Sequence, residues 1–254
     1  MIGGKGTAMM YEDVVMTAKE VINSRTNYRN RKVIYVPCPI WEAGNQINLW
    51  SYWQGFQLKD IGKERVDILL VGQDWGSPDK HPYECKRIEE IQAGENLRYI
   101  AESATDKNLA KMFKVFGEHI DINSEDPGMR LFFTNYSLGY RSKDISESGG
   151  MTKTLMKMDD DLFRDLVEAL NPKIIVCLGK LTYECVSNQR VKDFIRQLHD
   201  GKPFVSPYPY KEDIPVYGVS HTGARGISNI GGEEKMRRAW QKIADDYYSL
   251  YQNT

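Results

Sequence analysis

The chain alternates between short, continuous apolar runs and longer segments in which apolar residues recur at helical spacing. Unbroken apolar runs of roughly four to eight residues are typical of strands that are covered on both faces, as in a parallel sheet. Four such runs are predicted as strands: 67–72 (DILLVG), 131–138 (LFFTNYSL), 173–179 (KIIVCLG) and 214–221 (IPVYGVSH).

Segments with helical periodicity lie before, between and after these runs. Helices are predicted over 10–22, within 96–116, over 160–170, from 181 to 186 and over 233–250. Because strands alternate with helices, we expect an α/β fold: a three-layer α/β/α sandwich with a central, mostly parallel four-stranded sheet. In such sheets, ligands bind beyond the carboxyl ends of the strands.

Domain boundaries are not apparent in the sequence, which has no repeat, low-complexity tract or Pro/Gly-rich linker. We therefore expect a single domain over 1–254, with 1–60 as a helical and aromatic extension packed on it. The basic stretch 25–32 (RTNYRNRK) is either a solvated loop or an edge that faces phosphates. The aromatic stretch 38–56 is either a lid or side wall of the core, or a surface on which bases stack.

Composition narrows the class of protein further. Hydrophobic residues make up 41% and charged residues 27%, as in soluble globular proteins, and no apolar run approaches the roughly 18 residues of a membrane span. The first residues lack a signal-peptide core, so a cytoplasmic location is expected. We also expect a monomer. The net charge of −1 neither indicates nor excludes nucleic acid, because a local basic surface suffices for phosphate contacts.

Cysteine spacing gives no indication of a metal site. The four cysteines include no CxxC pair, so we expect no metal, cluster or other cofactor. Cys177 lies inside the third apolar run and is predicted to be a buried thiol.

Polar residues follow three of the four predicted strands. Gln73-Asp74-Trp75 follows the first, Asn135 ends the second, and His221 ends the fourth. If the strands are parallel, these side chains meet at one edge of the sheet. Taken singly, Asp74 could be a helix N-cap, Asn135 a turn residue and His221 a structural histidine, so their coincidence is more specific than any one of them.

The three side chains offer different chemistry. The carboxylate of Asp74 can orient a water molecule or stabilise positive charge. The amide of Asn135 both donates and accepts hydrogen bonds, so it can read the edge of a base. The imidazole of His221 can donate a hydrogen bond to an oxygen that becomes negative.

The order and spacing of these motifs resemble the uracil-DNA glycosylase superfamily. The matching segments are GQDWGSP (72–78), FFTNYSLGYR (132–141), NPKIIVCLG (171–179), SHTGARG (220–226) and MRRAW (236–240). The resemblance spans roughly 66–248 and leaves the first sixty residues unexplained. It implies a uracil-DNA glycosylase-like fold and hydrolysis of the bond between base and sugar after the nucleotide is flipped out of DNA.

The resemblance also assigns roles to residues. It implies that Asp74 and His221 are catalytic and that Asn135 pairs with the uracil edge. The base pocket would further include Gly72, Gln73 and Trp75, and the implied DNA contacts are Arg141, Ser220, Thr222, Arg225 and the wedge Ile227.

Two positions depart from the commonest motifs, since Trp75-Gly76 stands for Pro-Tyr and Thr222-Gly223 for Pro-Ser. Trp75 could close the pocket, stack on the base or fill the core. The leading hypothesis is a DNA glycosylase acting on uracil or a related deaminated base. A non-catalytic nucleic-acid or nucleotide-binding protein is the alternative, and a hydrolase or transferase of free nucleosides is the third possibility.

Overall fold

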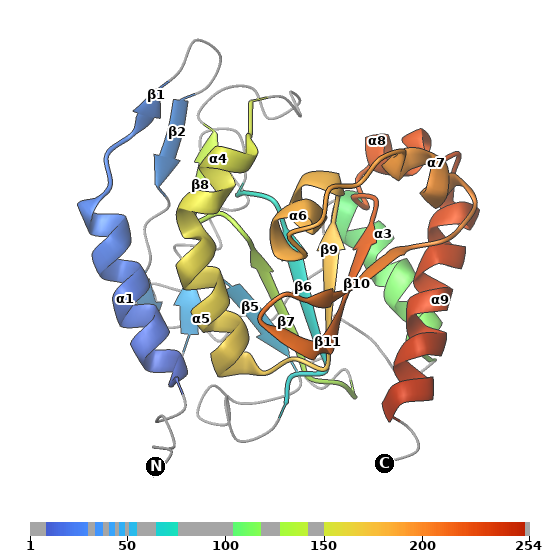
Figure 1. Cartoon of the computed structure of the whole chain (residues 1–254), viewed down its shortest axis with the longest axis horizontal. Helices are drawn as coiled ribbons and strands as arrows, with labels where there is room; N and C mark the ends of the chain where they lie inside the picture. The colour runs from blue at the N-terminus through green and yellow to red at the C-terminus, as the bar shows by residue number, and fades with distance from the viewer. Residues whose placement is uncertain are drawn as a thin grey trace.

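The computed structural model describes residues 9–29, 34–37, 41–43, 46–48, 51–54, 65–75, 104–117, 128–141 and 150–251. Between 41 and 54 it describes the backbone alone. Everything below refers to these residues. The chain forms a mixed α/β structure in which a mostly parallel sheet is covered by helices (Figure 1).

The main sheet has six strands in the order β10-β11-β9-β6-β7-β5. Its four inner strands are mutually parallel, and β5 and β10 pair antiparallel at the two edges. The bounds are Ser51–Gln54 (β5), Ile68–Gly72 (β6), Leu131–Asn135 (β7), Ile174–Leu178 (β9), Phe204–Tyr208 (β10) and Lys211–Val219 (β11).

The four strands predicted from the apolar runs are β6, β7, β9 and β11, and all four run parallel as expected. The sheet is larger than the predicted four strands because two edge strands were missed. β10 contains Pro207 and alternates between exposed and half-buried positions, so it lacks an unbroken apolar run. β5 lies in the aromatic stretch whose pattern was irregular.

Helices surround the sheet, and their bounds are α1 Tyr11–Ser24, α3 Ala104–Phe113, α4 Lys153–Met156, α5 Asp160–Leu170, α6 Lys180–Val186, α7 Phe194–His199, α8 Ala224–Asn229 and α9 Glu233–Tyr251. Two short 3-10 turns, η3 Lys114–Phe116 and η4 Lys157–Asp159, follow α3 and precede α5. α5 ends where predicted, because Asn171 adopts the left-handed conformation (φ 43°) directly before Pro172.

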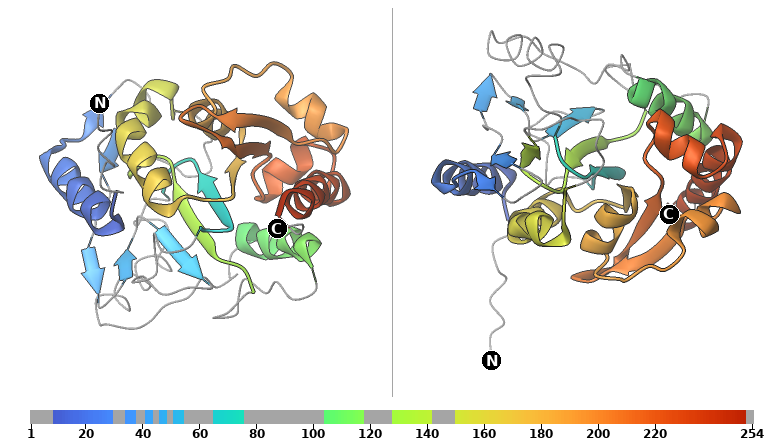
Figure 2. Two further views of the ribbon diagram at one scale, coloured as in Figure 1. Left: turned by 60° about the horizontal axis from the view of Figure 1, so that its bottom comes forward. Right: turned by 90° about the horizontal axis from the view of Figure 1, so that it is seen from above.

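Both faces of the sheet are covered, as two neighbouring phenylalanines of β7 demonstrate. Successive side chains of a strand point to opposite faces. Phe132 packs edge-on against Tyr11 of α1, with ring centroids 5.9 Å apart, whereas Phe133 lies 5.8 Å from Phe113 of α3. α1 and α5 therefore lie over one face, and α3 and α9 over the other, where Trp240 is fully buried (Figure 2).

The N-terminal segment is an integral part of this architecture. α1 packs on α5, and β1 (Tyr28–Arg29), β2 (Ile34–Pro37) and β8 (Gly139–Arg141) form a second sheet of three antiparallel strands. A separate two-stranded hairpin joins β3 (Trp41–Ala43) to β4 (Gln46–Asn48). The lid or base-stacking role predicted for the aromatic side chains of 38–56 lies outside the described side chains.

In the basic stretch predicted as a solvated loop or a phosphate-facing edge, the described residues 26–29 are exposed. Arg25 at its start differs, because its side chain is largely covered and pairs with Asp159. The two side chains form an ion pair and are 11% and 1% exposed. Asp159 also accepts hydrogen bonds from the Leu138 N–H (2.8 Å) and the Ser137 hydroxyl (3.2 Å). Since Tyr35 of β2 contacts the same serine hydroxyl, the N-terminal segment is anchored to the loop that follows β7.

Other expectations can be compared directly with the structure. Cys177 is fully buried, as predicted. In the described part of the chain, no helix combines the length and the apolar character needed to cross a bilayer.

Candidate active site

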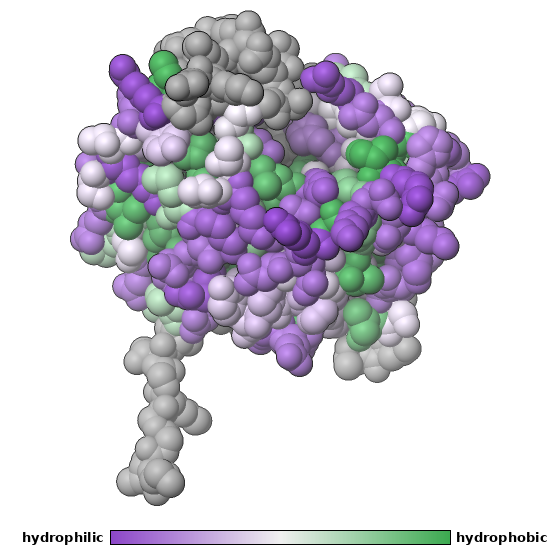
Figure 3. Space-filling model, turned by 45° about the horizontal axis from the view of Figure 1, so that its top comes forward, coloured by the Kyte–Doolittle hydropathy of each residue, from purple (hydrophilic) through white to green (hydrophobic). Residues whose placement is uncertain are grey.

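The carboxyl ends of the parallel strands meet along one edge of the sheet. β6 and β7 pair in register, so that Gly72 lies beside Asn135, and β11 ends at Val219, immediately before the segment that carries His221. The segments carrying Asp74, Asn135 and His221 therefore leave the sheet from the same edge, as predicted. Figure 3 brings this edge forward and shows hydrophilic side chains over much of the face, with apolar ones between them.

The segments that follow β6 and β7 are joined by their backbones. Three N–H groups donate across the gap, over 3.0, 3.1 and 3.1 Å: Tyr136 to the Gly72 carbonyl, Ser137 to that of Gln73, and Trp75 to that of Gly139. Trp75 also forms a parallel bridge with Tyr140. These hydrogen bonds fix the acid-bearing turn relative to the amide-bearing strand.

The last residue of β6 is a glycine, Gly72, and a side chain at this position would occupy the space of Asn135. A Cβ atom at this position would overlap the Oδ1 atom of Asn135, which lies over the glycine. The absence of a side chain thus allows the Asn135 amide to stand close to the start of the Gln73-Asp74 turn. A glycine at the end of a buried strand is a sequence signal for such a close approach.

Asp74 is held by two neighbours. The Arg141 guanidinium donates to both carboxylate oxygens, from Nε to Oδ2 at 2.6 Å and from Nη2 to Oδ1 at 3.3 Å. The Gln73 amide donates to Oδ1 at 2.8 Å. The Asp74 side chain is only 3% exposed and that of Arg141 15%, so the ion pair is largely removed from water.

Opposing effects act on the proton affinity of Asp74. Burial raises the pKa of the Asp74 carboxyl above its usual value, because a carboxylate loses hydration in the protein interior. The charge of Arg141, its hydrogen bond and that of Gln73, and the charge of His221 each lower the pKa, without fully offsetting burial. His221 is thus one of the charged groups that act on Asp74, and its effect is the smallest of those named.

The ring of His221 is oriented by its own loop. The backbone N–H of Gly223 donates to Nδ1 of the ring at 2.9 Å. An accepting Nδ1 carries no proton, so the neutral ring carries its proton on Nε2. Among the described residues, none accepts a hydrogen bond from that Nε2–H group.

The pKa of His221 also favours the neutral form of the ring. The residue is exposed at the loop surface, yet the protein around the imidazole lowers the pKa of His221 below its usual value, because the cation loses hydration. The negative charges of Asp106 and Asp74 oppose this effect and raise the pKa. At neutral pH the ring therefore serves as an uncharged hydrogen-bond donor.

Two residues of the histidine loop that were predicted to contact DNA point into the protein. Ser220 is 5% exposed, and its hydroxyl donates to the Gly226 carbonyl at 2.9 Å. Thr222 is fully buried, and its carbonyl accepts a hydrogen bond from the Asn108 amide of α3 at 3.0 Å. In this conformation both residues hold the loop, and neither presents its hydroxyl to solvent.

The remaining predicted contacts lie on α8 and in the first turn. Arg225 is exposed at the start of α8, whereas Ile227 is half-buried and packs against the core. The backbone of Trp75 is fixed against β8, and its side chain is half-buried. The pocket-closing, stacking and core-filling roles considered for Trp75 all stay predictions.

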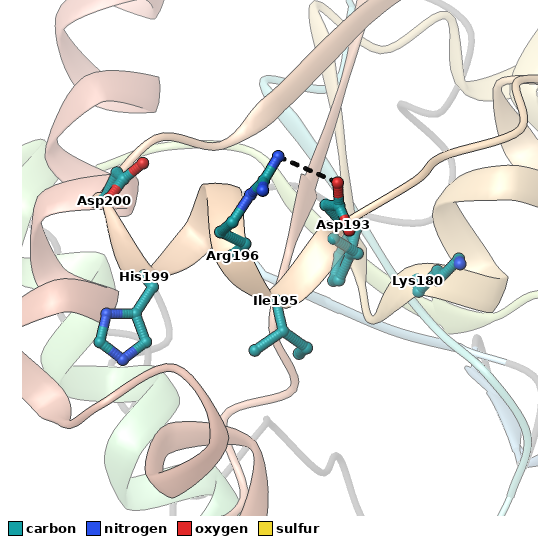
Figure 4. Close-up of a pocket in the computed structure, with 7 residues that line it drawn as sticks. Lys180, Asp193, Ile195, Arg196, His199 and Asp200 are labelled. Atoms are coloured by element: carbon teal, nitrogen blue, oxygen red, sulfur yellow. Dashed lines mark ion pairs between the residues drawn. The ribbon is translucent and has the colours of Figure 1, made fainter.

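A separate cavity of about 640 Å³ lies beside α7 and contains none of the predicted site residues. Figure 4 shows Arg196 paired with Asp193, while the His199 ring points away from that pair. Charged side chains line the cavity together with Phe194 and Ile195, and its large opening makes it a surface depression. Nothing in its lining assigns it a ligand.

In sequence, no protein-family model matches the chain, and no curated protein matches it either.

Sequence reasoning missed Asn108 and did not find the partner of Arg141. Asn108 fixes the histidine loop from 114 positions away, and no motif marked it. Arg141 was recognised, but as a DNA contact, whereas in the structure it pairs with Asp74. An arginine shortly after the second strand could signal such a pair only if the return of β8 toward β6 were known.

Proposed function

We propose that this protein is a DNA glycosylase that hydrolyses the N-glycosidic bond of uracil, or of a related deaminated base, flipped out of DNA during base-excision repair. Within this proposal the parallel strands β6, β7, β9 and β11 form the core of a uracil-DNA glycosylase-like sandwich. The protein works in the cytoplasm as a monomer on uracil-containing or otherwise damaged DNA. The proposal rests on the motif resemblance and on the geometry of the site.

One observation carries the proposal: a buried carboxylate and an imidazole with an available Nε2–H lie within electrostatic reach at the sheet edge that also carries Asn135. A glycosidic bond breaks with the electron pair leaving on the base, so the base becomes negative and the sugar becomes positive. A hydrogen-bond donor and a carboxylate, placed on either side of that bond, stabilise the two developing charges.

In the proposed reaction His221 donates its Nε2–H to a base oxygen that gains negative charge. A neutral donor suits this task, because the hydrogen bond strengthens as the charge develops and no proton need leave the ring. The lowered pKa and the accepting Nδ1 both favour this form of His221. No metal or redox cofactor takes part in these steps.

Asp74 acts on the sugar side of the bond. Its carboxylate stabilises the positive charge of the sugar and orients the water that adds to the carbon from which the base departs. Asn135 selects the base, because its amide presents one donor and one acceptor to the edge of a pyrimidine. Asn135 stands beside Gly72 without a side chain between them, which brings base recognition close to the acid-bearing turn.

The proposal is tested by the release of free base from oligonucleotides that carry uracil, hypoxanthine or xanthine, in single and double strands. We expect release from at least one substrate and a loss of about 10²–10³-fold in Asp74→Asn and in His221→Ala. Asp245→Asn serves as the matched control, because Asp245 lies exposed on α9. A wild-type protein that releases none of these bases would contradict the proposal.

A second candidate is a protein that recognises a base or damaged DNA without cleaving it. The observation in its favour is the occupancy of Asp74, whose two oxygens are taken by Arg141 and Gln73. Such a protein would bind uracil-containing DNA, would lose affinity in Asn135→Ala, and would form no product. Equal affinity of Asp74→Asn and wild type, together with an absence of release, would favour this candidate.

A further inference from the structure

Arg141 lies where two parts of the chain come together. It ends β8, and the register places it opposite Tyr35 of β2. On its other side β8 meets the acid-bearing turn, since Trp75 donates its N–H to Gly139 at 3.1 Å. The strand that carries Arg141 is thus held both by the N-terminal segment and by the turn that carries Asp74.

The side chain of Arg141 is aimed at the acid and not at solvent. Two roughly parallel hydrogen bonds join its guanidinium to the Asp74 carboxylate, in the forked geometry that fixes both groups. Gln73 occupies the remaining side of Oδ1. An arginine that is 15% exposed and committed to a buried partner is poorly placed to reach a DNA phosphate.

The pair also supplies the buried carboxylate of Asp74 with an opposite charge. A carboxylate buried alone takes up a proton, because an unpaired charge is costly in a medium of low polarity. Among the described residues, the charged groups that face Asp74 are Arg141 from β8 and His221 from the segment after β11, and the effect of Arg141 is the larger of the two. Arg141 is therefore the main counter-charge of the acid.

We propose that Arg141 is a positioning residue that keeps Asp74 ionised and fixes its orientation, and that it is not a phosphate contact. This inference rests on the proposed function only in assigning Asp74 a catalytic role. It also gives the N-terminal segment a part in the site, because β2 pairs with the strand that presents Arg141.

The first test needs no substrate. The carboxyl carbon of Asp74 is followed by NMR as pH is varied, and its signal is identified by its loss in Asp74→Asn. In Arg141→Gln we expect the titration midpoint of Asp74 to move upward by about one to three pH units, because an opposite charge is removed. Arg141→Lys, which restores the charge, returns most of that shift, and Arg237→Gln on the exposed face of α9 leaves the midpoint unchanged.

The second test separates positioning from DNA contact. We measure the affinity for a uracil-containing oligonucleotide at several salt concentrations. Arg141→Gln should keep the wild-type salt dependence, whereas Arg225→Gln at the exposed start of α8 should reduce the slope by about one. A reduced slope in Arg141→Gln, or an unchanged midpoint of Asp74 in that variant, would overturn the inference.

The outcomes remain separable from those of the proposed function. If the protein releases no base but the Asp74 midpoint moves as expected, the positioning role stands and the glycosylase proposal fails. If base is released, the acid limb of kcat/KM should rise with the midpoint in Arg141→Gln and return in Arg141→Lys. An acid limb that stays in place would mean that Arg141 does not control the acid during catalysis.

Discussion

Gly223 donates its backbone N–H to Nδ1 of His221 at 2.9 Å, so the loop itself selects the tautomer that carries the proton on Nε2. The donor and the ring are two residues apart, so the bond is a local property of the turn. It requires the turn to keep its shape, which the contacts of Thr222 and Ser220 with neighbouring elements provide. The neutral ring therefore has one defined tautomer.

The tautomer of His221 can be changed by one substitution. Gly223 has φ −63° and ψ 158°, angles that proline adopts, so the backbone tolerates Gly223→Pro. The substitution deletes the N–H donor and puts the proline Cδ in its place against Nδ1, so the ring also has to turn away. We expect ¹⁵N spectra to show wild-type His221 protonated on Nε2 and the proline variant as a mixture of tautomers. Gly223→Ala keeps the donor, and its Cβ lies 3.0 Å from Nδ1, so the ring has to shift slightly while it keeps the hydrogen bond. We expect this variant to retain the Nε2–H form; a mixture in the alanine variant would contradict this explanation.

Asn108 should support His221 without touching it. Its amide donates to the Thr222 carbonyl at 3.0 Å, and Asn108→Ala removes that donor from a buried acceptor. We expect a loss of about 1–3 kcal/mol in the free energy of unfolding, measured with urea, together with a changed His221 ring signal. Lys107→Ala, at an exposed position of the same helix, should change neither. An unchanged His221 signal in Asn108→Ala would remove Asn108 from the site.

Gly72 and Asn135 should behave as a coupled pair. In Gly72→Ala the new methyl group overlaps Oδ1 of Asn135, and overpacking of this kind costs about 1–3 kcal/mol of folding free energy. In the Asn135→Ala background that amide is absent, so the same glycine substitution should cost less. Urea unfolding of the two single variants and the double variant measures the difference. Equal costs in both backgrounds would show that the two residues do not meet.

The pH dependence of stability should carry a contribution from His221. Its pKa is lowered in the folded protein, so the folded state binds the proton less readily than the unfolded chain. This contribution is complete above pH 6.5, the ordinary pKa, and is lost as the pH falls through the folded pKa. The free energy of unfolding should therefore fall less between pH 7 and pH 5 in His221→Gln than in wild type. Parallel curves for the two proteins would contradict the prediction.

The carboxyls of Asp74 and Asp159 contribute to the pH dependence of stability with a sign opposite to that of His221. Burial raises the pKa of each, so folding favours their protonated forms and their contribution is lost as the pH rises through the folded values. Comparison of His221→Gln with wild type cancels the contribution of Asp159, on which His221 has no effect. The contribution of Asp74 changes with that of His221, because each charge acts on the pKa of the other.

The buried pair of Arg25 and Asp159 should distinguish an integral N-terminal segment from an appended one. Removal of one partner of a buried ion pair costs about 3–5 kcal/mol, so Arg25→Met should lower the free energy of unfolding by that amount. Arg196→Met removes an exposed pair with Asp193 and should cost at most about 1 kcal/mol. Similar losses in the two variants would mean that the segment contributes little to the stability of the sheet.

The parts of the fold that could be predicted are those set by local pattern. Continuous apolar runs indicated β6, β7, β9 and β11 because both faces of these strands are covered. The relative direction of the strands then located Asp74, Asn135 and His221 at one edge. Edge strands escaped notice because one side of β10 faces solvent, which weakens its apolar pattern.

The partners of the site side chains could not be predicted, because they depend on where distant segments return. Arg141 is 67 positions from Asp74, and Arg25 is 134 positions from Asp159. Sequence patterns specify which face of a strand a residue occupies but not which charge lies opposite it. Arg25 was for this reason interpreted as a solvated or phosphate-facing residue, and Arg141 as a DNA contact.

The central claim is that an amide and an imidazole from distant strands face one planar base. Its most direct test is a titration of the protein with free uracil, hypoxanthine and xanthine, followed by ¹⁵N NMR at the Asn135 side-chain amide and at Nε2 of His221. With at least one base, both signals should move together along a single binding curve, and the His221 response should weaken in Asn135→Ala. Signals that respond to different bases, or that do not respond to any of them, would contradict the claim.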